Sequence, residues 1–377
     1  MKKSFCLFCA NYLPNIGGVE RYVYNLAKQL INLGHDVTVV TSNVFDLASH
    51  EVDENGIEIF RLPCYNFMKG RYPILKKDAE FKKLDAALCE KHFDLAVINA
   101  RFYIHSLYAA DFAKKNGIKS ITIEHGSTHL SVDNKILDFF VAHIEHFITV
   151  LLKKKCKEYY AVSNAAGKWS EHFGIKSKGT LYNAIDIESV VEARNKNVCD
   201  YRKEYNISSD ATIITFTGRL LKIKGVYELL DAFKQINRED MYLIYAGDGP
   251  EFDELKSNAC DRVIFLGKID FDHIVSLLDA SDIYCLPSVS EGMSTSVLEA
   301  VATKTFVITT YNGGARELIT SDEYGIITMG NSTEETKAAL EKAMDKDYRD
   351  KACDKAYQKL LDGFTWQKTA ENLESLI

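Results

Sequence analysis

Short apolar runs rich in β-branched and aromatic residues alternate along this chain with longer stretches in which apolar residues recur at helical spacing. The short runs predict twelve strands, six in each half. They cover residues 4–10, 36–41, 57–62, 95–99, 120–124, 160–162, 212–216, 242–246, 263–266, 283–286, 306–309 and 325–328. Strands that alternate with helices predict an α/β fold, here two parallel sheets with helices on both faces.

The length of 377 residues is long for one core and natural for two domains. Five prolines and the absence of any low-complexity stretch leave no room for a long linker, and the connection is expected near residues 182–186. We predict domains at residues 1–182 and 183–362, followed by a final helix at 363–377. We interpret Trp366 in this last segment as a buried structural aromatic residue.

The segment from Ser290 to Ala300, SEGMSTSVLEA, is the most informative one for chemistry. It follows a short apolar run, which places Glu291 on a strand-to-helix loop and Glu299 in the early turns of the helix. The loop amides and the helix N-terminus favour an anion, and the two carboxylates can accept hydroxyl groups on either side of it. This pattern predicts a nucleotide-sugar site. The alternative is a pair of ordinary solvated helix charges.

Two other loops share this strand-to-helix setting. Gly17 and Gly18 lie between the first strand and an amphipathic helix, where glycine allows close approach of a ligand to the backbone. Arg219 and Lys224 lie together on the loop after the strand at 212–216, as a departing diphosphate requires. Alternatively, they are two exposed cations on a turn.

Five motifs spread over nearly the whole chain resemble glycosyltransferase family 4, in its order: GGVE, GRLLKIKG, YAGDGPE, SEGMSTSVLEA and YNGGARELI. The resemblance implies a retaining, metal-independent transferase of the hexosyltransferase type with the GT-B fold. This fold has two Rossmann-like doubly wound domains with a cleft between them, where the donor lies. The first domain would be the acceptor side, the second would bind the nucleotide sugar, and the final helix would pack back on the first.

Matching positions assign roles by the same resemblance. Glu299 would hold the ribose hydroxyls of the nucleotide, and Glu291, followed by Gly292, would contact the hydroxyls of the transferred sugar. Arg219 and Lys224 would bind the diphosphate. Together with His125, Arg219, Lys224 and Glu291 are the candidate catalytic residues.

Backbone amides around Met293, Ser294 and Thr295 would help to bind the diphosphate. Gly17 and Gly18 would close over the same phosphates from the other domain. Many relatives have an aromatic residue and a glycine where this chain has Met293 and Ser294. The serine amide can still serve a phosphate, but this difference leaves the shape of the sugar pocket, and hence the sugar, undefined.

His125 follows an apolar strand, at the strand end where open α/β sheets place ligands. It matches a position where the family often has a histidine that faces the reacting sugar. The alternative is a loop histidine bonded to backbone. Lys268 and Ile269 resemble the family's base-contacting loop.

Transfer develops negative charge on the departing diphosphate, which fixed positive charge stabilises. Arg219, Lys224 and the helix-end amides provide this charge, and no DxD motif follows a suitable strand. We therefore expect no metal and no cofactor apart from the donor substrate. No residue stands out as a covalent nucleophile, and attack from the face of the leaving group is expected.

Charge is unevenly distributed between the two predicted domains. Residues 1–182 contain 24 Lys and Arg against 19 Asp and Glu, whereas the rest of the chain contains 22 Lys and Arg against 34 Asp and Glu. Cations gather beside apolar residues from Lys69 to Lys83 and from Leu151 to Lys157, which suits anionic lipid headgroups or a lipid diphosphate, or an ordinary solvated face. The net charge of −7 and the lack of a known module argue against nucleic acid. With no membrane span or signal peptide recognised, we expect a cytoplasmic protein, in contact with the inner face of the plasma membrane if the basic segments bind lipid.

Nine scattered cysteines, an odd number, predict reduced thiols rather than a disulfide framework. Cys6 and Cys9 form a CxxC, but within a strand-like run and with no second pair to complete a zinc site. We interpret them as small apolar core residues.

The function predicted is transfer of a sugar, from a UDP-sugar by default, to a hydroxyl of a saccharide or lipid-linked acceptor in cell-surface polysaccharide synthesis. Alternatives are a GT-B epimerase and a non-catalytic nucleotide-sugar binding module. A dinucleotide oxidoreductase is disfavoured because GDGPEF lacks the last glycine of GxGxxG.

Overall fold

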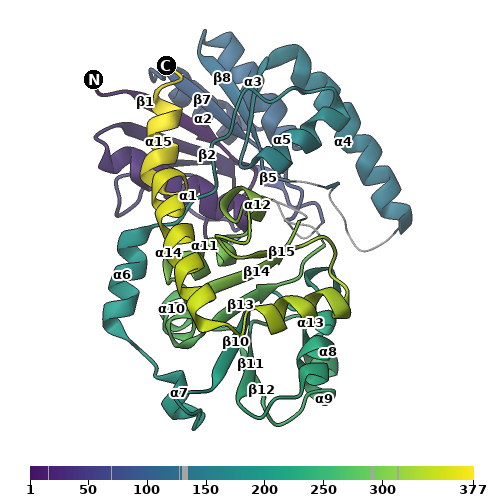
Figure 1. The fold of residues 1–377 in the computed structure, drawn as a ribbon. Coiled ribbons are helices and arrows are strands. Elements are labelled where there is room, and N and C mark those ends of the chain that lie inside the picture. The colour runs from purple at the N-terminus through teal and green to yellow at the C-terminus, as the bar shows by residue number, and fades with distance from the viewer. Residues whose placement is uncertain (16, 69, 127, 130–134, 290–292, 312–313) are drawn as a thin grey trace. The chain divides into compact units, whose positions relative to one another are not determined.

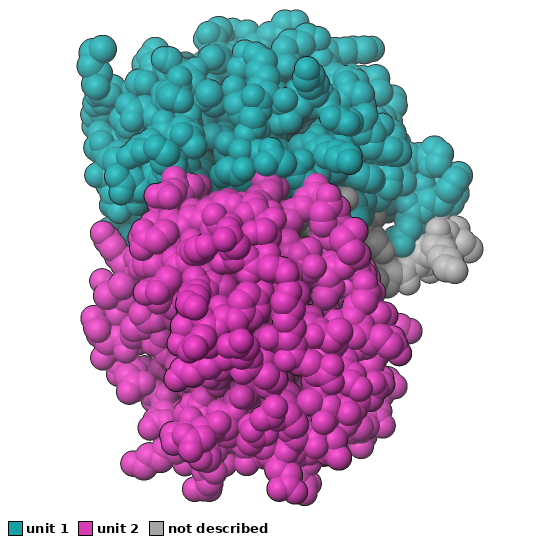
Figure 2. Space-filling view, in the orientation of Figure 1, with its two compact units in different colours: residues 1–183, 366–377 teal, residues 184–365 magenta. Residues whose placement is uncertain are grey.

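The structure is a computed structural model that describes residues 1–377 apart from 16, 69, 127, 130–134, 290–292 and 312–313. The chain forms two compact units, each with its own sheet (Figure 1). Unit 1 comprises Met1–Asn183 and Trp366–Ile377, and unit 2 comprises Ala184–Thr365 (Figure 2). Each unit is described by itself below.

The sheet of unit 1 has seven strands in the order β3-β4-β2-β1-β7-β8-β9, all parallel except β3, which runs antiparallel to β4. A short hairpin, β5-β6, lies outside this sheet. The strands are β1 Ser4–Phe8, β2 Asp36–Ser42, β3 His50–Val52, β4 Glu58–Leu62, β5 Cys64–Tyr65, β6 Ile74–Leu75, β7 Leu95–Asn99, β8 Lys119–Glu124 and β9 Glu158–Ala161.

The helices of unit 1 pack on the sheet or on one another: α3 packs on β7 and β8, α4 on α3, and α15 on α1. In α1, Tyr22, Val23, Leu26 and Leu30 recur at helical spacing and are at most 1% exposed, as the sequence predicts. On α2, the side chain of Asp78 caps the first turn by accepting from the Phe81 amide. The helices are α1 Gly18–Asn32, α2 Ala79–Cys89, α3 Ile104–Lys115, α4 Lys135–Lys155, α5 Asn164–Ser170, the 3-10 turn η1 Glu171–Phe173 and α15 Trp366–Glu374.

The sheet of unit 2 has six parallel strands in the order β12-β11-β10-β13-β14-β15. The strands are β10 Thr212–Thr217, β11 Met241–Ala246, β12 Val263–Gly267, β13 Ile283–Leu286, β14 Phe306–Thr310 and β15 Ile326–Thr328. The helices are α6 Ile187–Lys196, α7 Tyr201–Glu204, the 3-10 turn η2 Lys222–Lys224, α8 Val226–Ile236, α9 Phe252–Ser257, α10 Phe271–Ala280, α11 Thr295–Ala302, α12 Ala315–Leu318, α13 Thr333–Lys342 and α14 Lys346–Gly363.

Both sheets follow the doubly wound order 3-2-1-4-5-6, with β3 as an extra edge strand in unit 1. In such sheets ligands bind beyond the carboxyl ends of the strands where the chain order reverses. The reversal lies between β1 and β7 in unit 1 and between β10 and β13 in unit 2. The loops that follow these strands are therefore the first places to look for a site.

All twelve strands predicted from the sequence are present, and the fold class is confirmed. Three short strands, β3, β5 and β6, were not predicted, because two or three residues give too little pattern to recognise. Cys6 and Cys9 are fully buried thiols, burial raises the pKa of both, and all nine cysteines are free. Trp366 is 5% exposed and packs edge to face on Tyr22, as a structural aromatic does.

Candidate functional site

Glycine allows three loops at the carboxyl edge of the unit 2 sheet to pack directly on one another. A Cβ on Gly247 would lie 1.8 Å from the carbonyl oxygen of Gly218, and one on Gly225 would lie 2.1 Å from that of Pro287. Gly218 and Gly247 also have positive φ angles, which glycine adopts without strain. The loop after β10 is thus held between the loops after β11 and β13, at the point where the strand order reverses.

Arg219 and Lys224 lie on this loop, Arg219 exposed and Lys224 half-buried in the 3-10 turn η2. The turn is fixed to the β13 loop because Ile223 O accepts from the Val289 amide at 3.0 Å and from Ser288 Oγ at 3.2 Å. Two cations are therefore presented from backbone that is held on both sides.

The helix α11 begins at the same edge. Met293 and Ser294 are both 7% exposed, and the Ser294 hydroxyl is hydrogen-bonded to that of Ser296 at 2.8 Å instead of capping the helix. Glu299 lies on the fifth residue of α11 and is also 7% exposed, whereas Thr295 is half-buried. The side chain of the N-cap residue Ser294 makes no capping hydrogen bond to the first turn of α11, so the amides of this turn can serve an anion.

The predicted sugar-contacting pair Glu291 and Gly292 lies outside the residues that the structure describes. The same holds for part of the YNGGARELI motif, at 312–313. Of the proposed base-contacting residues, Lys268 is exposed after β12, while Ile269 packs against the apolar cluster around Tyr201 and Ile213. The side chain of Ile269 thus has a structural role, whatever its backbone contacts.

In unit 1, Gly17 and Gly18 open α1, and a Cβ on Gly18 would meet no atom within 4 Å. At Gly17, however, a Cβ would lie 2.3 Å from Oε2 of Glu20. The Glu20 carboxylate accepts from Asn15 Nδ2 at 2.9 Å and from the amides of Gly17 and Glu20, although burial raises its pKa. Glu20 thus caps the N-terminus of its own helix, a role that was not predicted and whose signal in the sequence was a Glu at the helix start.

His125 lies just after β8, next to the reversal point of the unit 1 sheet. Its Nε2 is 3.0 Å from Asn99 Oδ1, and Asn99 Nδ2 in turn donates to Phe8 O at 3.1 Å. Because Asn99 uses its amide nitrogen there, its oxygen faces His125, which assigns the proton to Nε2 and makes Nδ1 the acceptor. Desolvation lowers the pKa of His125 to about 3, so the ring is neutral at physiological pH.

The loop that holds His125 is anchored by a buried ionic network that the sequence analysis did not identify. Glu124 Oε1 accepts from the amides of His125 and Gly126, both at 3.0 Å, and Arg101 Nε is 2.5 Å from Glu124 Oε2. Arg101 Nη2 also pairs with Glu145 at 2.6 Å, and all three side chains are at most 3% exposed. Glu124 ends β8 and Arg101 lies two residues after β7, and these positions at strand ends were the available signal.

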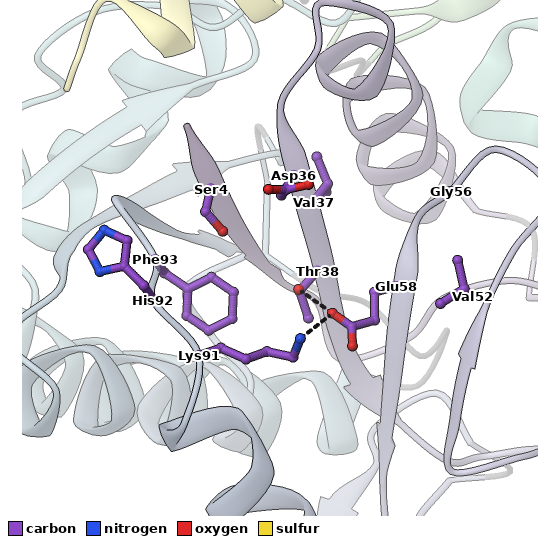
Figure 3. A pocket seen from close by; sticks show the side chains of 10 residues that line it. All are labelled: Ser4, Asp36, Val37, Thr38, Val52, Gly56, Glu58, Lys91, His92 and Phe93. Atoms are coloured by element: carbon purple, nitrogen blue, oxygen red, sulfur yellow. Dashed lines mark hydrogen bonds and ion pairs between the residues drawn. The ribbon is translucent and has the colours of Figure 1, made fainter. Parts of the chain in front are cut away.

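A cavity of about 370 Å³ in unit 1 lies at the opposite edge of the sheet (Figure 3). Its lining includes Ser4, Asp36 and Glu58, which begin β1, β2 and β4. Lys91 and Thr38 both bond to Glu58, at 2.8 and 3.1 Å (Figure 3). Burial would raise the pKa of Glu58, but its partners hold it below the ordinary value. Since ligands bind at the carboxyl ends of such strands, we assign no role in the reaction to this cavity.

The two doubly wound units, both with the strand order 3-2-1-4-5-6, are those of the GT-B fold class. The profile of Glycosyltransferase Family 4 matches residues 16–189, and that of Glycosyl transferases group 1 matches residues 198–360. The chain belongs to this family of glycosyltransferases, which confirms the resemblance seen in the motifs.

Curated relatives cover nearly the full chain. An N-acetyl-alpha-D-glucosaminyl L-malate synthase of Bacillus anthracis is 28% identical over 96% of this chain and 94% of its own length. An uncharacterised glycosyltransferase of Methanocaldococcus jannaschii is 25% identical over 100% and 98%. The phosphatidylinositol N-acetylglucosaminyltransferase GPI3 subunit of Saccharomyces cerevisiae is 24% identical over 85% and 70%.

Solved structures share the fold. A glycosyltransferase of Rickettsia africae has a TM-score of 0.76 at 20% identity, covering 100% of this chain and 97% of its own. HepE of Anabaena, in complex with UDP, has a TM-score of 0.75 at 18% identity, covering 99% of both chains. These likenesses place the chain among GT-B proteins.

Proposed function

We propose that the protein is a retaining glycosyltransferase that uses a nucleotide diphosphate sugar and needs no metal at the diphosphate. One observation carries this proposal: Arg219 and Lys224 project from a loop locked at the reversal point of the unit 2 sheet, beside the uncapped start of α11. Fixed cations and free amides at one edge stabilise the charge that develops on a departing diphosphate.

The remaining groups follow the same logic. Glu299, buried on α11, is our candidate for the ribose hydroxyls. His125 is neutral, so it would serve the transferred sugar as a hydrogen-bonding group and not as a cation. Lacking a candidate covalent nucleophile, the proposed reaction uses attack from the face of the leaving group, with the diphosphate accepting the proton of the acceptor hydroxyl.

For the donor we propose a UDP-sugar. HepE was solved with UDP, and two curated relatives are named for N-acetylglucosaminyl transfer. UDP-N-acetylglucosamine therefore comes first in a panel of nucleotide sugars, with UDP-glucose beside it. We place the enzyme in the cytoplasm, where nucleotide sugars are made.

Lys224→Ala should lower kcat by about 10²- to 10³-fold and disturb the unfolding midpoint far less, because the lost charge acts on the leaving group. The matched control is Lys222→Ala, an exposed lysine of the same turn, which should retain activity. Wild-type turnover in the Lys224 variant would contradict the proposal. Product without any acceptor would instead favour the epimerase, and donor binding without turnover the binding module.

For the acceptor we propose a lipid-linked molecule at an anionic membrane surface, in surface polysaccharide synthesis. No helix among the described residues is long and apolar enough to cross a bilayer. A cavity of about 220 Å³ in unit 1 is nevertheless lined by apolar side chains except for Glu145: Phe67, Met68, Tyr72, Ile74, Phe102, Ile104, Val141 and Ile144.

Beside this cavity, α4 exposes Phe139, Phe140, Phe147 and Val150, each more than half, and its last turn carries three lysines. Exposed aromatic residues followed by cations suit an anionic lipid surface. The basic segment from Leu151 to Lys157 thus contains the end of this helix. A membrane contact through the basic segment from Lys69 to Lys83 stays a prediction.

Phe147→Ser should weaken flotation with phosphatidylglycerol vesicles by about tenfold, because burial of one Phe contributes about 1.5–3 kcal/mol. Phe45→Ser, at an equally apolar exposed site elsewhere in unit 1, is the control and should bind as wild type. Equal flotation of both variants would exclude α4 as the membrane contact.

A further inference from the structure

Three histidines from separate segments of unit 1 converge on one point. His129 lies on the loop after β8, His146 on α4 and His172 on η1. One ring nitrogen from each of the three lies within 4.8 Å of those from the other two. Among the described residues, this is the one group of three or more His, Cys, Asp or Glu side chains placed to hold a metal ion.

The spacing of the rings matches metal coordination. Zinc binds histidine nitrogen at about 2.0–2.1 Å in tetrahedral geometry, which sets neighbouring nitrogens about 3.3–3.4 Å apart. Nε2 of His146 and Nε2 of His172 are 3.2 Å apart. Since the three ligand atoms lie within 4.8 Å of one another, the third nitrogen needs a shift of at most about 1.5 Å to complete the face of a tetrahedron, which a loop residue can make.

The third histidine is already oriented for this role. His129 Nδ1 is 2.7 Å from Glu145 Oε2, which directs Nε2 as the remaining ligand atom. Glu145 is held in turn by Arg101 at 2.6 Å. A carboxylate behind a metal-binding histidine fixes its tautomer and its ring orientation, and that arrangement is typical of protein metal sites.

Aromatic side chains fix the other two rings. Trp169 stacks on His172 with an interplanar angle of 8° and centroids 5.0 Å apart. Phe173 packs on His146 at 4.6 Å. Ring rotation, which would separate the ligand atoms, is thereby restricted.

We infer that His129, His146 and His172 form a binding site for one divalent transition-metal ion of the zinc class, with a fourth position open to water. Three imidazoles suit zinc, copper or nickel and do not suit magnesium or calcium, which prefer oxygen ligands. The ion would tie the loop after β8, which also carries His125, to α4 and η1. It is separate from the diphosphate chemistry, for which we propose no metal.

The site is tested by titrating cobalt and zinc into full-length protein that has no histidine tag and has been stripped with a chelator. We expect one Co²⁺ per chain with the intense visible absorption of a four-coordinate ion, displaced by one equivalent of Zn²⁺. His129→Gln, His146→Gln and His172→Gln should each weaken Zn²⁺ binding by at least tenfold in calorimetry. Circular dichroism of the metal-free variants verifies that they are folded.

His143→Gln is the matched control, because His143 lies on the same helix, is exposed and bonds to Phe139 O. It should bind Zn²⁺ as the wild type does. Loss of affinity in His143→Gln, equal affinity in the three site variants, or a weak octahedral cobalt spectrum would overturn the proposal. None of these outcomes bears on Lys224, so the metal site and the proposed function can fail independently.

Discussion

The two units share one strand order but treat the reversal point differently. In unit 2 the loops after β10 and β13 present two cations and an uncapped helix start, on backbone packed through glycine. In unit 1 the corresponding region satisfies its own charges: Glu20 caps α1, and Arg101 lies between Glu124 and Glu145. The same fold thus offers fixed positive charge in one unit and neutral hydrogen-bonding groups in the other.

This difference indicates a division of labour. A diphosphate needs charge stabilisation, which unit 2 can supply, whereas a sugar needs uncharged donors and acceptors, which suits the neutral His125. In our proposal the buried charges of unit 1 position a loop, whereas the two cations of unit 2, Arg219 and Lys224, act on the ligand. Substitution of the charged residues in unit 1 should therefore reduce stability, whereas substitution of those in unit 2 should reduce activity.

The largest effect is expected from Arg101→Met, which leaves two buried carboxylates without their guanidinium. Breaking such a network costs roughly 3–5 kcal/mol. Both tryptophans, Trp169 and Trp366, belong to unit 1, so tryptophan fluorescence in guanidinium reports the unfolding of this unit. Arg21→Met, at an exposed arginine of α1, is the control and should change stability little. Similar midpoints for the two variants would show that the network does not hold the unit together.

A smaller effect is expected from Gly225→Ala, compared with Gly267→Ala. Both glycines have similar positive φ angles, +72° and +66°, so the two variants share the backbone strain. Only the Cβ at position 225 meets an atom, Pro287 O at 2.1 Å, while nothing lies within 4 Å of the other. Gly225→Ala should lose about 1–3 kcal/mol more, the typical cost of overpacking.

Far-UV circular dichroism follows both units, and the tryptophans follow only unit 1. The loss in Gly225→Ala should therefore shift the dichroism transition and leave the fluorescence transition in place. Equal losses of stability in the two glycine variants would mean that backbone strain, and not loop packing, determines the loss.

The fold was predictable because its information is local. Each long strand has a continuous apolar run and each long helix a 3.6-residue stripe, as in β10 and α1, and their alternation fixes a parallel sheet. The strands β5 and β6 have two residues each and are defined by pairing with each other, so nothing local reveals them.

The positions of the candidate site residues in the fold were predictable only where a motif spans one loop. Arg219, Lys224 and Glu299 lie on such loops or helix starts, at the sheet edge that the pattern indicates. Arg101 and Glu145 meet across 44 residues, and the three histidines come from three elements, so the fold alone brings them together. The cap of α1 was missed because Glu20 was considered only as the last residue of the GGVE motif and was given no role of its own.

Unit 1 is completed only when α15 has been synthesised, because unit 2 lies between this helix and the rest of unit 1 in the sequence. Trp366 of this helix packs on Tyr22, whose ring also contacts His125 edge to face at 4.8 Å, and Lys3 and Lys119 bond to carbonyls near the helix end. A ribosome makes this helix only after all of unit 2. The Tyr22 ring of the nascent first unit therefore lacks its Trp366 partner until the α15 segment has been synthesised, and truncation ahead of Trp366 would remove a packing partner of the ring that contacts His125.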